Sequence, residues 1–99
     1  MSFNLNQIES QKGKIAIVTG ANNGLGKEIT IGLAKKEVKV IMACRNIKKA
    51  ELTKNEIIKI IPSADIEIME LDLNSLKSVR NFAKSYCDKY NQLNFMIEN

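Results

Sequence analysis

The stretch at residues 18–28 reads VTGANNGLGKE. Its three glycines, Gly20, Gly24 and Gly26, follow an apolar run and precede a pattern that is typical of a helix. Three interpretations compete for it: a β-hairpin that turns at Asn23-Gly24, an ATP-type P-loop around Gly26-Lys27, and a loop that holds the phosphates of a dinucleotide. The flanking sequence decides among the three.

The chain alternates between segments that resemble strands and segments that resemble helices. Short apolar runs rich in β-branched residues predict strands at residues 14–19, 39–44, 66–71 and 93–97. Apolar residues at helical spacing predict helices at residues 24–36, 47–61 and 76–90, and Pro62 closes the second of them. The order βαβαβαβ, with near-continuous apolar strands, predicts an α/β fold: a doubly wound parallel sheet with helices on both faces.

The hairpin and the ATP-type loop both fail against this pattern. A hairpin needs a strand on each side, but Leu25, Ile29 and Leu33 recur at helical spacing after the glycines. An ATP-type P-loop reads Gly, four residues, then Gly-Lys-Ser/Thr; here Ala21 replaces the first glycine and Glu28 the hydroxyl residue. We therefore favour a dinucleotide loop, in which a tight glycine turn and the start of a helix bring backbone N–H groups to a pyrophosphate.

Two positions at the ends of the next strands support this interpretation. Folds that bind NAD commonly place an acid roughly 20 residues beyond the glycine loop, where it binds the ribose hydroxyls. This chain has Arg45 there without a carboxylate beside it, and a guanidinium suits a 2′-phosphate, so NADP(H) is favoured over NAD(H). The alternative is an ordinary solvent-facing arginine. Asp72 is a candidate acceptor for the adenine amino group, with the Leu73 backbone alongside, and its charge also suits the start of the next helix.

Composition narrows the function further. The 99 residues, 44% of them apolar, suit one globular unit, and the absence of histidine argues against metal chemistry. The 15 Lys and Arg against 11 Asp and Glu are scattered among few aromatics, which predicts a solvated surface and no nucleic-acid partner. No apolar run approaches the roughly 20 residues of a transmembrane segment. Cys44 and Cys87 lack the spacing of a disulfide or metal pair, and the sequence shows no signal peptide. Both observations predict free thiols in a reducing compartment, the cytoplasm.

Taken together, the motifs resemble those of the short-chain dehydrogenase/reductase family. The shared motifs are, in chain order, Thr19-Gly20-x-x-x-Gly24-x-Gly26, Arg45, Asp72-Leu73 and Ile97-Glu98-Asn99. The phrases VIMACRN and LDLNSLKSVRNFA are similar to the branch that contains retinol dehydrogenases and protochlorophyllide reductases. The resemblance runs from about Lys12 to the last residue and covers the cofactor-binding half of the family.

The resemblance implies a Rossmann-like sheet with strand order 3-2-1-4, in a partial NADP-binding domain at residues 12–99 that follows a polar extension at residues 1–11. It implies an oxidoreductase that moves a hydride between NADP(H) and a carbonyl or alcohol carbon of a small-molecule substrate, in a family that commonly forms homo-oligomers. The cofactor-binding residues that it implies are Gly20, Asn22, Asn23, Gly24, Leu25, Gly26, Arg45, Asp72, Leu73 and Asn99.

The family's catalytic Ser and Tyr-x-x-x-Lys are not among these 99 residues, so no catalytic residue is assigned. We expect the chain to be the front part of a longer enzyme, also because its last strand would form an unprotected apolar edge. The alternatives are a dinucleotide-binding or sensing module without turnover, and a domain that binds nucleic acid or a protein through its basic surface. Tyr86 has a lysine three residues later instead of four, and we expect it in the core.

Two acidic residues depart from the family pattern. Glu98 is expected to bring a carboxylate to the end of a buried strand, where it lowers stability unless it is paired or protonated. Glu37 stands at a helix exit where relatives often carry glycine, and a left-handed backbone there would be strained.

Overall fold

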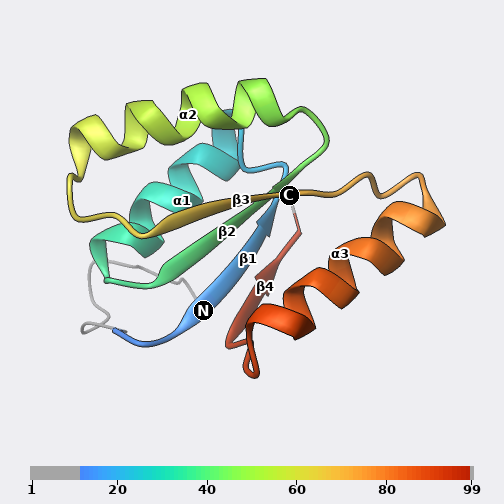
Figure 1. Ribbon diagram of the computed structural model, residues 1–99. Helices are drawn as coiled ribbons and strands as arrows, with labels where there is room; N and C mark the ends of the chain where they lie inside the picture. The colour runs from blue at the N-terminus through green and yellow to red at the C-terminus, as the bar shows by residue number, and fades with distance from the viewer. Residues whose placement is uncertain (1–11, 99) are drawn as a thin grey trace, which may run out of the picture.

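Strands and helices alternate along the chain in the computed structural model, which describes residues 12–98 (Figure 1). The strands are β1 (Ile15–Thr19), β2 (Lys39–Cys44), β3 (Ile66–Glu70) and β4 (Phe95–Ile97). The helices are α1 (Gly24–Lys35), α2 (Ile47–Ile60) and α3 (Leu76–Lys89). The predicted order βαβαβαβ is therefore confirmed. The extension proposed at residues 1–11 and the site residue Asn99 lie outside the described residues.

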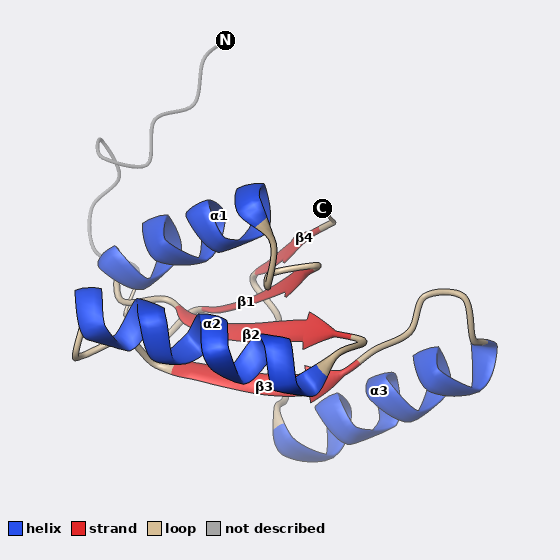
Figure 2. Ribbon diagram, turned by 90° about the horizontal axis from the view of Figure 1, so that it is seen from above, coloured by secondary structure: helices blue, strands red, loops and turns tan. Residues whose placement is uncertain are grey.

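The four strands form one parallel sheet in the order β3-β2-β1-β4, as predicted. The connection after β3 carries the chain past β2 and β1 before β4 joins the far side of β1. Figure 2 shows the result: α1 and α2 cover one face of the sheet, and α3 covers the other. The fold is a Rossmann-like, doubly wound α/β sheet.

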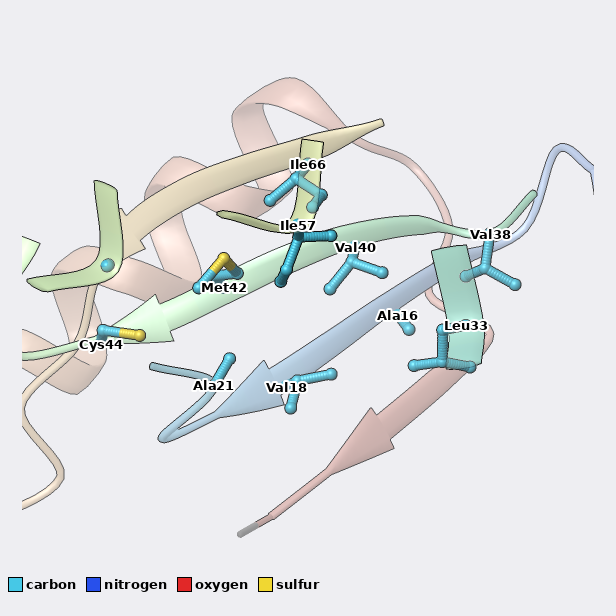
Figure 3. Packing of buried hydrophobic residues seen from close by; sticks show 11 residues of the cluster. Ala16, Val18, Ala21, Leu33, Val38, Val40, Met42, Cys44, Ile57 and Ile66 are labelled. Carbon is cyan, nitrogen blue, oxygen red and sulfur yellow. The ribbon is translucent and has the colours of Figure 1, made fainter. Parts of the chain in front are cut away.

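The central strands bury side chains on both faces of the sheet. Successive strand residues point to opposite faces, so alternate residues of β1 and β2 belong to two separate cores. The core under α1 and α2 includes Ala16, Val18, Val40, Met42, Leu33 and Ile57 (Figure 3). The core under α3 includes Ile15, Ile17, Ile41, Ala43, Phe82 and Tyr86. Covering on both faces explains why these strands are almost continuously apolar, with polar residues only at Thr19 and Lys39, and Tyr86 is a core residue as expected.

The last strand is shorter than predicted. It begins at Phe95, two residues later than the predicted start, because Asn94 contacts β1 partly through its side chain. The Asn94 Oδ1 accepts a hydrogen bond from the Ile15 N–H (2.9 Å), while the Asn94 N–H donates to the Ile15 carbonyl (3.0 Å). The expectation of a buried Glu98 is wrong: the residue is exposed, since β4 pairs only with β1 and Met96 beside it is 54% exposed.

The end of α1 contains the strained backbone that the sequence predicted at Glu37, whose φ is +64°. The Glu37 N–H donates to the Ala34 carbonyl, and the Val38 N–H donates to the Leu33 carbonyl. These two bonds form a Schellman motif, in which the residue in the left-handed conformation is usually glycine. Val38 and Leu33 also share the core under α1. The turn is therefore well anchored, but its central residue is of an unfavourable type.

Replacing Glu37 by glycine is expected to stabilise the protein. A left-handed backbone costs an L-residue about 1–2 kcal/mol, and part of the gain is offset by the greater freedom of glycine in the unfolded chain. Glu37→Gly should therefore raise the free energy of unfolding by up to about 1 kcal/mol in urea titrations followed by circular dichroism. The control is Glu37→Ala, which removes the same side chain but keeps the strain. If Glu37→Gly and Glu37→Ala were equally stable, the backbone at residue 37 would not be strained.

Candidate functional site

Three strand ends meet at one edge of the sheet. In the parallel register Thr19 lies beside Ala43, and Cys44 lies beside Glu70, so β1, β2 and β3 end at the same level. The segments that follow these strands surround a hollow of about 280 Å³. It is lined by Thr19, Gly20, Ala43, Arg45, Leu71, Asp72, Leu73 and Asn74. Ligands of open α/β sheets bind at this carboxyl edge, near the point where the strand order reverses.

The structure brings four of the predicted site residues together in this hollow: Gly20, Arg45, Asp72 and Leu73. The other predicted residues of the glycine stretch lie in the adjoining turn and in the first turn of α1; they are Asn22, Asn23, Gly24, Leu25 and Gly26. Sequence reasoning missed four lining residues: Thr19, Ala43, Leu71 and Asn74. In the sequence, only their position could have identified them, because each lies within two residues of a predicted site residue.

A tight turn connects β1 to α1. Gly20 has a φ of +60°, a left-handed conformation that glycine adopts without strain. Its N–H donates to the Ala43 carbonyl of β2 (3.1 Å), and its carbonyl accepts a hydrogen bond from the Asn23 N–H (3.3 Å). The turn is thus held against the neighbouring strand and delivers the chain directly to the start of α1.

The start of α1 presents backbone donors at this edge. The Lys27 N–H donates to the Asn23 carbonyl (2.7 Å), so the preceding N–H groups of Gly24, Leu25 and Gly26 have no partner within the helix. The first turn of α1 contains no acidic residue. Together with the helix dipole, these donors make the start of α1 suitable for binding an anion.

The fold does not explain why residue 24 is glycine. The φ of Gly24 is not left-handed, and a Cβ added there would meet no atom within 4 Å. Alanine would suit the helix better, by up to about 1 kcal/mol. A glycine at this point leaves the backbone open to the close approach of a ligand, for which a Cβ would be in the way.

Arg45 supplies a positive charge at the end of β2. Its side chain is exposed, and no carboxylate of the described part of the chain forms an ion pair with it. Asn46, which follows, caps α2 by accepting a hydrogen bond from the Lys49 N–H (3.1 Å). The guanidinium is therefore available to an anionic ligand, at a position fixed by β2 and by the start of α2.

Asp72 is held in a turn before α3. Its N–H donates to the Ser78 Oγ (2.9 Å), and its Oδ1 accepts a hydrogen bond from the Asn74 N–H (2.9 Å). The capping residue of α3 is Ser75, whose Oγ accepts a hydrogen bond from the Ser78 N–H. Asp72 thus keeps one carboxylate oxygen for a ligand in the hollow, while the other oxygen stabilises the turn.

A larger hollow, of about 480 Å³, lies at the opposite edge of the sheet, where β1 and β2 begin. Lys39 lines it, but this ammonium is paired with Asp65 (3.0 Å) and lies over the ring of Tyr90 (5.6 Å). Burial raises the pKa of the neighbouring Glu67, but hydrogen bonds from Lys89 and Tyr90 outweigh this effect and hold the pKa below its ordinary value. Lys39 is thus occupied by its partners within the protein, and the hollow contains none of the predicted site residues, so we place the functional site at the carboxyl edge.

Three further observations concern residues 12–98. In this range no group of three or more His, Cys, Asp or Glu side chains is placed to hold a metal ion. None of the three described helices is both long enough and apolar enough to cross a membrane. Both cysteines are free: Cys44 is buried and Cys87 is exposed.

Comparison with known proteins gives consistent similarities. The family model described as "short chain dehydrogenase" matches residues 14–99. Mouse retinol dehydrogenase 11 is 41% identical over 87 residues, which cover 88% of this chain and 28% of that protein. Mouse retinol dehydrogenase 13 is 38% identical over 87 residues, covering 88% of this chain and 26% of that protein. The chain therefore spans little more than a quarter of the length of these relatives.

Solved structures show the same fold. Menthone neomenthol reductase from Mentha piperita superposes with a TM-score of 0.82 and 30% identity, over 91% of this chain and 32% of that one. The RhlG/NADP active-site complex of Pseudomonas aeruginosa gives a TM-score of 0.80 and 26% identity, over 91% of this chain and 35% of that one. The sheet and its helices therefore follow an arrangement that occurs in both of these proteins.

The two glycines of the turn are expected to respond differently to alanine. Gly20→Ala should lower the free energy of unfolding by about 1–2 kcal/mol, because its left-handed φ strains any residue with a Cβ. Gly24→Ala should leave this free energy unchanged or raise it by up to about 1 kcal/mol. Urea titrations of both variants measure the difference. A destabilised Gly24→Ala variant would show that the fold itself requires this glycine.

Proposed function

Because the chain belongs to the short-chain dehydrogenase family, we propose that it forms the cofactor-binding part of an NADP(H)-dependent oxidoreductase. The observation that carries the proposal is Gly24, a glycine that neither the backbone nor the packing requires, at the anion-binding start of α1. A pyrophosphate at this point would use the space that a Cβ would fill. Since the chain spans 28% of mouse retinol dehydrogenase 11, the activity of the whole protein is part of this proposal.

Each part of the dinucleotide has candidate partners along the carboxyl edge. The turn residues Gly20, Asn22 and Asn23 and the first helical N–H groups, those of Gly24, Leu25 and Gly26, would hold the pyrophosphate. Asp72 would accept a hydrogen bond from the adenine amino group, with the Leu73 backbone alongside. Asn99, which follows the described residues, would lie beside the cofactor at the end of β4.

The preference for NADP(H) over NAD(H) rests on Arg45. A dinucleotide site for NAD commonly has an acid near this point, whereas a guanidinium binds a phosphate through two parallel hydrogen bonds. Arg45 lines the hollow and has no acidic partner in the described part of the chain. The similarity to RhlG, whose structure is described as an NADP complex, supports the same preference.

The bound cofactor would supply a hydride that is exchanged with a carbonyl or alcohol carbon of a small-molecule substrate. The names of the relatives, which are retinol dehydrogenases, support an alcohol or aldehyde substrate. This chain's own residues would bind and orient the cofactor. No Tyr-x-x-x-Lys occurs among the 99 residues, and the Tyr86 hydroxyl is used in the core, where it donates to the Gln92 carbonyl (2.6 Å). For this reason binding without turnover is the alternative for the chain by itself.

Reversing the charge of Arg45 tests the cofactor preference. Arg45→Asp should weaken NADPH binding by about tenfold or more, because charge-assisted hydrogen bonds to the 2′-phosphate are lost and a repulsive charge is added. NADH affinity should stay the same or rise. The matched control is Arg80→Asp, at an exposed arginine on α3, which should change neither affinity. Calorimetric titration measures the two affinities for the unmodified protein and for both variants. Equal NADPH affinity in Arg45→Asp and the unmodified protein would contradict the assignment.

Filling the space at Gly24 tests the pyrophosphate position. Gly24→Ala should weaken the binding of NADPH and of NADH by the same factor, because both dinucleotides carry the pyrophosphate. The free energy of unfolding should not fall. Fluorescence titration of the reduced nicotinamide reports both affinities. If Gly24→Ala binds both dinucleotides as tightly as the unmodified protein does, the pyrophosphate lies elsewhere.

A further inference from the structure

A side chain of α2 holds the main chain of Asn22 in the glycine turn, and a buried thiol lies near the same segment. Cys44, the last residue of β2, is 3% exposed and close enough to the N–H groups of Ala21 and Asn22 for them to influence the pKa of its thiol. Thr53, on α2, is 8% exposed and donates from its Oγ1 to the Asn22 carbonyl (3.4 Å). Figure 3 shows the Cys44 sulfur pointing toward the segment that carries Ala21.

These contacts are neutral and internal. Burial raises the pKa of the Cys44 thiol, and this effect outweighs the opposing influence of the Ala21 and Asn22 N–H groups. The thiol therefore stays protonated at neutral pH, with little of the thiolate character that a nucleophile needs. Cys44 and Thr53 both lie beneath the turn, away from the solvent side on which a ligand would approach.

The contacts determine which donors the turn can present. The donors that the turn can offer a ligand are those at the start of α1, where the first N–H groups have no partner within the helix. The Asn22 carbonyl, which would repel a phosphate, is held by the Thr53 hydroxyl. Helix α2, which carries Thr53, begins just after Arg45, so the same helix would position the turn and the guanidinium.

We propose that Thr53, acting with Cys44, is a positioning residue for the phosphate-binding turn. The proposal rests on the dinucleotide function proposed above, and neither side chain would touch the ligand. Thr53→Val keeps the shape of the side chain and removes the hydroxyl, whereas Thr53→Ser keeps the hydroxyl. A difference between these two variants therefore reports the hydrogen bond to Asn22.

The first experiment measures the turn without any ligand. Mass spectrometry follows alkylation of Cys44, with the exposed Cys87 as the internal reference. Thr53→Val should raise the rate at Cys44 relative to Cys87 by about two- to tenfold, as expected for the loss of one hydrogen bond, and Thr53→Ser should keep the original rate. The control is Ile57→Val, which loosens the buried face of α2 but keeps the hydroxyl of Thr53. Equal rates in Thr53→Val and Thr53→Ser, or an equal rise in Ile57→Val, would overturn the proposal.

The second experiment measures the consequence for binding. Thr53→Val should weaken the binding of NADPH and of NADH by the same factor, about two- to tenfold, because Arg45 keeps its charge. Thr53→Ser should bind both dinucleotides as the unmodified protein does. This pattern differs from that of Arg45→Asp, which changes the ratio of the two affinities. If the unmodified protein binds neither dinucleotide, the proposed function fails, and the alkylation rates still decide whether Thr53 holds the turn. If the unmodified protein binds and Thr53→Val binds equally well, the positioning role alone is overturned.

Discussion

The parallel pairing of β2 with β1 on one side and β3 on the other is the constraint on which the site depends. Two backbone hydrogen bonds extend this pairing past the ends of the strands: the Gly20 N–H donates to the Ala43 carbonyl, and the Leu71 N–H donates to the Cys44 carbonyl. They bring three segments that are far apart in the sequence to one level of the sheet. A shift of one residue in either pairing would move the side chains of each core to the opposite face of the sheet, so the packing of the two cores keeps the register fixed.

Three positions near the ends of these strands differ in whether the backbone requires a glycine. Gly20 is required by its left-handed backbone, and Gly24 is left unexplained by the fold and points to a ligand. At residue 37 the opposite holds, since the backbone suits glycine and glutamate is present. The sequence motif alone treats Gly20 and Gly24 alike, because the spacing of glycines says nothing about which one a ligand approaches. Only φ and the space around each Cα separate the two roles.

Much of the architecture could be predicted from the sequence because local and global signals agree. Apolar runs covered on both faces predicted β1, β2 and β3 closely, and the positions of Arg45 and Asp72 at strand ends predicted which residues share an edge. The start of β4 could not be predicted, since Asn94 pairs with Ile15 through its side chain and periodicity does not report such a contact. The exposure of Glu98 depends on how few neighbours surround β4. The contacts of Cys44 and Thr53 with Asn22 likewise depend on α2 packing beside the turn, which no local pattern encodes.

Binding of a nicotinamide dinucleotide at the carboxyl edge of this sheet can be tested by NMR titration of the isotope-labelled chain with NADPH. The largest amide shifts are expected at Gly20, at residues 24–26, and at Arg45 and Asp72. The amides around Lys39 and Asp65, at the opposite edge, should not shift. Shifts concentrated at that opposite edge, or no saturable shifts at all, would contradict binding at the carboxyl edge.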